Sequence, residues 1–218
     1  MPAVDLRLYL VTDRSLSLGR SLPEVVESAV RGGVTLVQLR EKEADSRDFY
    51  QLALALKQLL RPYHVPLIIN DRLDIALAVD ADGIHIGQSD LPYPVVRQLL
   101  GKEKIIGLSV ESLSDAALAN QWDVDYIAIS PVYATPTKTD TAPALGLEGV
   151  RAIKELSVHP IVGIGGITQD NAADIIRAGA DGIAIVSGIM SAPDPEKAAR
   201  EFRNRIDKTQ ELYLTDYR

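Results

Sequence analysis

Short runs of almost wholly apolar residues alternate along this chain with longer segments in which apolar residues recur at helical spacing. Eight of the short runs have the length and the β-branched or leucine-rich composition of strands. They are Leu8 to Val11, Leu36 to Leu39, Leu67 to Ile69, Gly83 to Ile86, Ile105 to Leu108, Tyr126 to Ile129, Ile161 to Gly163 and Gly182 to Ile185. Because polar residues do not alternate within these runs, both faces of each strand should be covered, as in parallel sheets.

The segments between the runs predict helices. Their ranges are Leu22 to Arg31, Asp48 to Leu60, Leu73 to Val79, Val95 to Leu100, Leu113 to Gln121, Leu147 to Leu156, Asn171 to Ala178 and Pro195 to Ile206. Capping residues indicate where some of these helices begin. The capping residues are Ser21 with Glu24, Ser112 with Asp115, and Asp194 before Pro195.

Repeated strand and helix units predict a single-domain α/β protein, a (β/α)8 TIM barrel. An open, doubly wound sheet is the alternative, although that fold has little use for such even spacing of its units. We assign residues 1–206 to the barrel, which is the catalytic domain, and residues 207–218 to a polar C-terminal tail. Such a tail frays, covers the barrel or reaches a neighbouring subunit.

Composition narrows the range of functions. The 218 residues are 46% hydrophobic and 24% charged, which is ordinary for a globular protein. The absence of cysteine excludes disulfides, a thiolate nucleophile and cysteine-ligated zinc. A formal net charge of -7 argues against nucleic-acid binding, so an anionic ligand needs a local basic cluster. With no candidate membrane span or signal peptide, we expect a cytoplasmic protein with small-molecule substrates and a homo-oligomer as one possible assembly.

Polar residues follow the predicted strands, and in a (β/α)8 barrel the loops after the strands meet at one face. After strands two to five these residues are Gln38, Arg40, Lys42, Asn70, Asp71, Gln88, Asp90 and Ser109. The loop of residues 130–146 adds Thr135, Thr137 and Lys138, and the last two strands lead to Gly165, Gly166, Val186, Ser187 and Gly188. We expect all of them to face one mouth.

Several of these residues suit anionic ligands. The glycine pair after strand seven and the backbone near Ser187 can bring N–H groups close to a phosphate. The alternative is a pair of tight turns that require glycine. Arg40, Lys42 and Lys138 could together clamp a second anion, whereas each alone would be an ordinary solvated charge.

Two carboxylates, Asp71 and Asp90, follow adjacent strands and suit Mg2+, which binds one or two carboxylates together with substrate phosphate oxygens. The alternative is that each carboxylate caps the helix that follows it. The three histidines lack metal-ligand spacing, and His85, which lies within a strand, is expected to be a packed core residue. The chain carries no nucleophile elbow, Walker loop or GxGxxG motif.

Seven short motifs lie in a regular order after or within successive strands. They are LYLVTD from Leu8, VQLREK from Val37, INDR from Ile69, GIHIGQSD from Gly83, GLS from Gly107, TPTK from Thr135 and IGGI from Ile164. In this order the chain resembles the thiamine-phosphate synthase family over residues 6–206. Each motif alone is modest, but the combination is specific.

The resemblance implies a transferase that joins hydroxymethylpyrimidine diphosphate to hydroxyethylthiazole phosphate, or its carboxylated form, with Mg2+ and release of diphosphate. The implied ligands of the pyrimidine diphosphate are Gln38, Leu39, Arg40, Glu41, Lys42, Asn70, Ser109 and Lys138, with Arg40, Lys42 and Lys138 catalytic. The implied Mg2+ ligands are Asp71 and Asp90. The implied ligands of the thiazole phosphate are Thr135, Pro136, Thr137, Gly166, Val186 and Ser187.

The chain departs from the family pattern at Ser130, where the family often has glycine, and at Glu111, where a less acidic residue is expected. A related tautomerase branch is expected to carry a histidine in the loop after strand six, where this chain has Pro131. Two other functions stay open at this stage. One is a tautomerase or other phosphate-handling barrel without the diphosphate step, and the other is a non-catalytic sensor of thiazole or thiamine phosphate.

Overall fold

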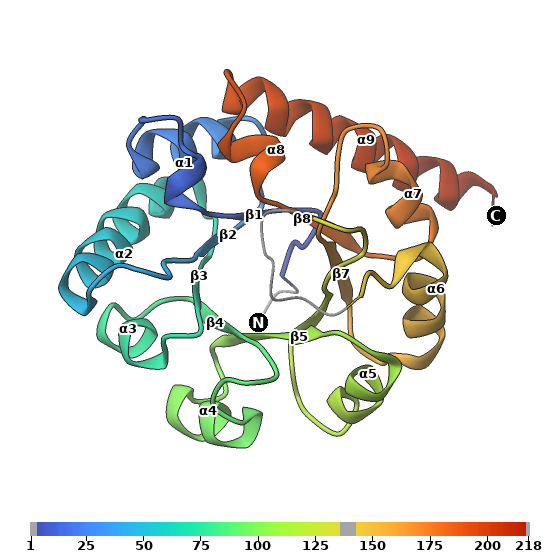
Figure 1. The fold of residues 1–218 in the computed structure, drawn as a ribbon, viewed down its shortest axis with the longest axis horizontal. Helices are drawn as coiled ribbons and strands as arrows, with labels where there is room; N and C mark the ends of the chain where they lie inside the picture. Colours follow the sequence, from blue (N-terminus) through green and yellow to red (C-terminus); the bar gives the residue numbers. More distant parts are fainter. Residues whose placement is uncertain (1–3, 136–142, 217–218) are drawn as a thin grey trace.

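The eight predicted strands form a closed parallel barrel (Figure 1). The structure is a computed structural model and describes residues 4–135 and 143–216. The strands follow one another in chain order around the barrel, and the last pairs with the first in parallel register. Their bounds are β1 Leu8–Val11, β2 Leu36–Leu39, β3 Leu67–Asn70, β4 Gly83–Ile86, β5 Ile105–Val110, β6 Tyr126–Ile129, β7 Ile161–Ile164 and β8 Gly182–Ile185. The (β/α)8 barrel is therefore confirmed, and the open sheet is not formed.

Helices surround the barrel (Figure 1). Their bounds are α1 Leu22–Arg31, α2 Ser46–Leu60, α3 Leu73–Ala78, α4 Tyr93–Leu100, α5 Leu113–Ala119, α6 Gly146–Leu156, α7 Ala172–Arg177, α8 Ser187–Met190 and α9 Pro195–Asp216, with 3-10 turns η1 Arg14–Leu16 and η2 Arg61–Tyr63. The turns and α8 were not predicted, because three or four residues are too few to show a helical period. No helix in the described part of the chain is long and apolar enough to cross a bilayer.

Side-chain caps fix the starts of the helices where the sequence predicts them. Ser21 accepts a hydrogen bond from the N–H of Glu24, whose carboxylate accepts one from the N–H of Ser21, as in a capping box. Ser112 accepts from the N–H of Asp115, and Asp194 accepts from the N–H three residues further on. These bonds satisfy N–H groups that the first helical turn leaves without partners.

Apolar side chains pack in two layers. The outer layer lies between strands and helices and includes Leu39 and Phe49. The inner layer fills the barrel and includes Tyr9, Ile68 and Tyr126, all almost fully buried. Burial of this kind stabilises by about 25 cal/mol per Å² of apolar surface. A barrel filled in this way has no central pore, so any ligand site must lie at its ends.

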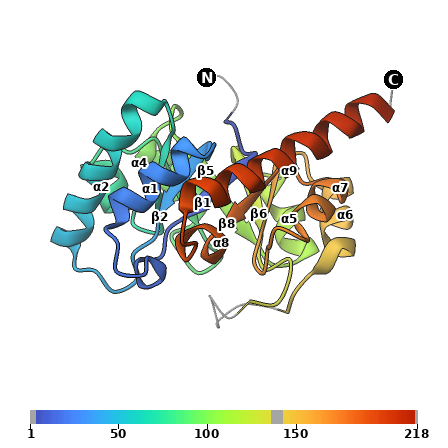
Figure 2. The same ribbon diagram turned by 90° about the horizontal axis from the view of Figure 1, so that it is seen from above.

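The last helix extends ten residues beyond the predicted boundary at residue 206. Figure 2 shows α9 running across the side of the barrel past α1 and α7, which it contacts. Asp207 accepts hydrogen bonds from Arg203 one turn earlier, Thr209 is buried, and Gln210 donates to the carbonyl of Asp181. The first part of the segment that we separated as a tail is therefore helical and packed against the barrel.

Candidate active site

A cavity of about 360 Å³ opens at the carboxyl ends of the strands. It is lined by residues at or after the carboxyl ends of all eight strands, so residues far apart in sequence meet there. Of the predicted site residues, those that line it are Gln38, Arg40, Lys42, Asn70, Asp71, Asp90, Ser109, Thr135, Gly166, Val186 and Ser187. The rule that loops after parallel strands share one face accounts for this meeting.

Two residues of the predicted set lie elsewhere. Leu39 points into the outer apolar layer and is fully buried there, because successive strand residues face opposite sides. The carboxylate of Glu41 pairs with Arg14 at 3.1 Å and is only 6% exposed, so it does not line the cavity. Burial raises the pKa of Glu41, and the Arg14 charge opposes this rise. Pro136, Thr137 and Lys138 lie outside the described residues.

Asp71 and Asp90 form an acidic pair at the rim of the cavity beside Lys42. The Nζ of Lys42 donates to the Oδ2 of Asp71 at 3.0 Å, and the Oδ2 of Asp90 accepts from the N–H of Gly87 at 2.7 Å. Burial, and then the neighbouring Asp71 carboxylate, raise the pKa of Asp90. Like charges brought together in this way favour a cation between them.

Neither carboxylate caps a helix. The helix α3 begins after Arg72 and α4 begins after Pro92, and neither N-terminus receives a side-chain hydrogen bond. Asp71 instead adopts a left-handed backbone conformation with φ of 60°, in the turn that leads from β3 into α3. The capping alternative is thus excluded by geometry for both residues.

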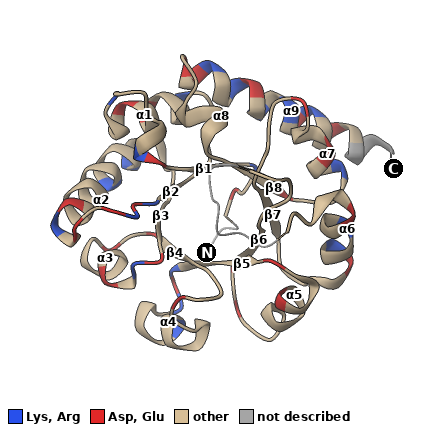
Figure 3. Cartoon of the chain, viewed as in Figure 1, with Lys and Arg blue, Asp and Glu red and all other residues tan. Residues whose placement is uncertain are grey.

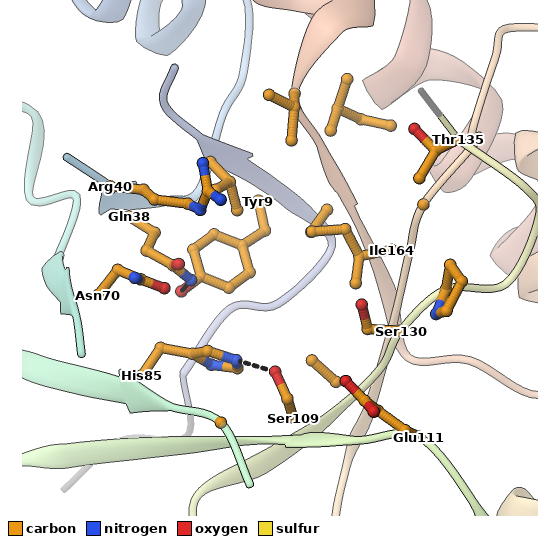
Figure 4. Close-up of a pocket in the computed structure, with 18 of the residues that line it drawn as sticks. Tyr9, Gln38, Arg40, Asn70, His85, Ser109, Glu111, Ser130, Thr135 and Ile164 are labelled. Carbon is orange, nitrogen blue, oxygen red and sulfur yellow. Dashed lines mark hydrogen bonds between the residues drawn. The ribbon is translucent and has the colours of Figure 1, made fainter. Parts of the chain in front are cut away.

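Arg40 is a cavity residue and not a freely solvated charge. Its side chain is 21% exposed, and its Nη1 lies 3.9 Å from the Oδ2 of Asp13. The backbone N–H of Arg40 donates to the hydroxyl of buried Thr12, which fixes the end of β2 against β1. Figure 4 shows the guanidinium beside Gln38 at the cavity wall. The arrangement holds a permanent positive charge at the cavity wall.

The glycine pair after β7 lies across the closed barrel from β3, near the start of α8. Gly165 and Gly166 have φ of 101° and 62°. A Cβ on Gly165 would meet Pro131 at 2.7 Å, and one on Gly166 would meet the carbonyl of Ala134 at 2.7 Å. Close approach of the loop after β6 therefore accounts for both glycines, whether or not a phosphate binds beside them.

A buried chain of polar side chains forms the floor of the cavity, and sequence reasoning missed most of it. It contains Gln38, Tyr9, Tyr126, His85 and Ser109, which hydrogen-bond to one another in that order. Burial raises the pKa of both tyrosines, so both remain protonated at neutral pH. Figure 4 shows His85 bonded to Ser109, with Gln38 beside the Tyr9 ring. His85 is buried, as expected, but it also lines the cavity.

Charge is distributed unevenly over the molecule. Lys, Arg, Asp and Glu residues lie mainly on the outer helices, with a further group on the loops next to β2, β3 and β4 (Figure 3). That second group includes Arg40, Lys42, Asp71 and Asp90 at the cavity. Although the net charge of the chain is negative, both cations and carboxylates lie at the mouth of the barrel.

A closed (β/α)8 barrel with a polar cavity at the carboxyl ends of its strands is the architecture of TIM-barrel enzymes. The model of the family described as thiamine monophosphate synthase matches residues 8–189, and the chain belongs to this family. The thiamine-phosphate synthase of Syntrophomonas wolfei subsp. wolfei is 57% identical over 199 residues, which cover 91% of this chain and 95% of that protein. That of Albidiferax ferrireducens is 54% identical, covering 93% and 92%.

A solved structure agrees with this assignment. The thiamine phosphate pyrophosphorylase from Pyrococcus furiosus superposes with a TM-score of 0.87 at 40% identity, covering 94% of this chain and 98% of that one. The family resemblance inferred from the seven motifs is confirmed. The chain is an enzyme, a transferase of thiamine biosynthesis.

Proposed function

We propose that this enzyme joins hydroxymethylpyrimidine diphosphate to hydroxyethylthiazole phosphate, or its carboxylated form, and releases diphosphate. The bond between the pyrimidine methylene carbon and the diphosphate oxygen breaks, and its electron pair leaves with diphosphate. The thiazole ring nitrogen then supplies the pair for a new carbon–nitrogen bond, giving thiamine phosphate. With the carboxylated thiazole, the same product also requires that the carboxyl group leave as CO2. Because little proton transfer is needed, the main demand on the protein is to stabilise the leaving diphosphate and to orient both substrates.

The observation that carries the proposal is the cluster of Lys42, Asp71 and Asp90 at the cavity rim, next to Arg40. A thiazole phosphate alone would require cations but not an acidic pair, and the acidic pair fits Mg2+. Within the described residues no three His, Asp or Glu side chains gather as a complete metal cage. Two carboxylates therefore suit an ion that keeps waters and substrate oxygens as its other ligands. When bound, Mg2+ would neutralise charge on diphosphate.

The protein's own cations act on the same group. Arg40 offers a planar fork of N–H donors for phosphate oxygens, and Lys42 offers a compact charge that can move from Asp71 to the ligand. Amides of Gln38 and Asn70 would orient the pyrimidine. As charge develops on the departing diphosphate, these preorganised donors stabilise the transition state more than the ground state.

The second substrate would bind on the far side of the cavity. Thr135, Gly166, Val186 and Ser187 line that side, which faces β3 and β4 across the closed barrel. This separation supports two ligands with their anionic groups apart and their reacting atoms toward the centre. Roles for Pro136, Thr137 and Lys138 stay predictions, as do cytoplasmic location and homo-oligomer formation.

Diphosphate release tests the reaction directly. We expect diphosphate from the two substrates together with Mg2+, little without Mg2+, and a fall of about 100-fold in turnover for Asp71→Asn with a weaker Mg2+ dependence. Asp74→Asn is the matched control, because Asp74 lies on α3, pairs with Arg72 and does not line the cavity. It should behave as wild type.

Each other outcome identifies a different function. Isomerisation of a thiazole phosphate without diphosphate release would indicate the tautomerase class. Binding of thiazole or thiamine phosphate with no turnover would indicate a sensor. An unchanged Mg2+ titration in Asp71→Asn would remove Asp71 from the metal site while leaving the reaction in place.

A further inference from the structure

A chain of hydrogen bonds crosses the interior of the barrel beneath the cavity. The Nε2 of Gln38 donates to the hydroxyl of Tyr9 at 2.7 Å, and the hydroxyls of Tyr9 and Tyr126 are 2.8 Å apart. The Tyr126 hydroxyl lies 3.0 Å from Nδ1 of His85, whose Nε2 lies 2.9 Å from Oγ of Ser109. Gln38, His85 and both tyrosines are buried, so water cannot readily replace these bonds.

One direction of donation along this chain starts from the Gln38 amide, the donor at one end. Because Tyr9 accepts from Gln38, its own proton is available for the oxygen of Tyr126. In this direction the proton of Tyr126 goes to Nδ1 of His85, which is then the unprotonated ring nitrogen. The proton of His85 then lies on Nε2 and is donated to Ser109. In this direction every link uses one donor and one acceptor.

The fold makes room for this chain. Gly107 on β5 pairs in register with His85 on one side and with Tyr126 on the other. A Cβ at Gly107 would lie 2.3 Å from the Tyr126 hydroxyl oxygen and 2.6 Å from Nδ1 of His85. The His85 and Tyr126 rings stack at 5.6 Å between centroids, and Tyr9 meets Tyr126 edge to face at 5.8 Å. The glycine is needed at this place because the hydroxyl must reach the imidazole.

We propose that Tyr9 and Tyr126 are positioning residues that hold His85 in its Nε2–H tautomer and fix the hydrogen-bonding polarity of Gln38 and Ser109 at the cavity. This proposal rests on the proposed function for the identity of the ligand. With its Nε2 bonded to Tyr9, Gln38 is held with its carbonyl oxygen available as an acceptor, and Ser109, which accepts from His85, has its proton available as a donor. An aminopyrimidine carries the complementary groups, N–H donors and ring-nitrogen acceptors.

The tautomer can be measured without any substrate. The chain has three histidines, so a ¹⁵N spectrum of the imidazoles is simple, and His85→Gln assigns the His85 signals. We expect a protonated Nε2 and an unprotonated Nδ1 in the wild type, and a mixture of tautomers in Tyr126→Phe, which keeps the ring but loses the hydroxyl. A protonated Nδ1 in the wild type, or an unchanged tautomer in Tyr126→Phe, would overturn the proposal.

Kinetics supply the second measurement. Tyr126→Phe and Tyr9→Phe should each lower kcat/KM for the pyrimidine diphosphate about tenfold, because each leaves a buried partner without its hydrogen bond. The KM for the thiazole phosphate should stay unchanged. The double variant Tyr126→Phe with Ser109→Ala should lose less transition-state stabilisation, measured from kcat/KM, than the sum of the losses in the two single variants, since both substitutions interrupt the same chain of hydrogen bonds.

A matched control separates positioning from packing. Tyr93→Phe also removes the hydroxyl of a buried tyrosine, one that donates to the carbonyl of Asp123 outside the barrel, and should change neither the tautomer nor the kinetics. Wild-type kinetics in both Tyr126→Phe and Tyr9→Phe would contradict the proposal. If the wild type releases no diphosphate, the proposed function fails, while the tautomer measurement still tests the positioning role by itself.

Discussion

The two carboxylates at the cavity rim are held together although, among residues 4–135 and 143–216, only Lys42 is seen to pair with either of them. Lys42 bonds Asp71, while Asp90 accepts a backbone N–H from Gly87. Burial and the adjacent Asp71 raise the pKa of Asp90 above its ordinary 3.8. Folding therefore disfavours the charged form of Asp90, and without a divalent cation this residue reduces the stability of the protein.

Asp90→Asn should therefore stabilise the metal-free protein at neutral pH. The asparagine oxygen can still accept from Gly87, and the repulsion by Asp71 is removed. The gain in unfolding free energy should be about 0.5 kcal/mol, the scale of a partly screened charge interaction. The pKa of Asp90 in the folded protein lies above 3.8, its ordinary value. As the pH falls through that raised pKa toward 3.8, Asp90 is protonated in the folded wild type and the repulsion by Asp71 disappears. The difference in unfolding free energy between wild type and Asp90→Asn therefore vanishes near pH 3.8.

Denaturant unfolding in the presence of a chelator, repeated from neutral to acidic pH, measures this difference. Asp74→Asn is the control, and it should change the unfolding free energy in the opposite direction. A hydrogen bond from Arg72 lowers the pKa of Asp74, so its contribution is present above 3.8 and is lost as the pH falls through the lowered value. An Asp90→Asn variant less stable than wild type at neutral pH would show that Asp90 is structural.

Individual site residues differed in how far the sequence could identify them. Arg40, Asp71 and Ser187 follow strands, and the barrel topology alone brings such residues to one mouth. Tyr9 and Tyr126 lie inside strands, where the sequence does not say which residues of different strands meet across the barrel. Their partnership depends on the stagger of the strands, which only the assembled barrel defines.

Elements were predicted to within a few residues wherever a chemical signal marks their ends. The strands are buried on both faces, and capping residues define the starts of α1, α5 and α9. The prediction stopped too early on α9, because residues 207–216 are mostly polar and resemble a tail. There, helical structure is maintained by Arg203 bonding to Asp207 along the helix and by Gln210 bonding to the body of the barrel.

A chain ending at Ile206 should for this reason be less stable than the full chain. The truncation removes the Asp207 contacts with Arg7 and Arg203 and the bond from Gln210, all partly exposed. We expect a loss of about 1 to 2 kcal/mol of unfolding free energy. A chain ending at Leu212, which keeps these bonds, is the control. Equal stability of all three chains would mean that residues 207–212 only extend the helix.

At the scale of the whole molecule, a net charge of -7 coexists with cations at the cavity, and the proposed binding of anions depends on these local cations. Exposed charges act over about 8 Å at physiological ionic strength, so the acidic outer helices contribute little inside the cavity. Closure of the barrel places the charged cavity residues and Ser187 after different strands. Arg40 and Lys42 lie after β2, whereas Ser187 follows β8, which stands across the barrel from β4 and its Asp90.

This arrangement predicts that binding of diphosphate and binding of thiazole phosphate can be weakened by separate substitutions. Lys42→Ala should weaken binding of Mg2+-diphosphate about tenfold, because it removes a cation at the rim where diphosphate is proposed to bind. Thiazole phosphate binding should change less than about twofold in that variant. Ser187→Ala should show the reverse pattern, with a loss of about threefold to tenfold for thiazole phosphate. Titration calorimetry of each ligand against each variant gives all of these constants. If both substitutions weaken both ligands equally, the cavity is a single anion site, and a reaction between two separately held substrates would lose its structural basis.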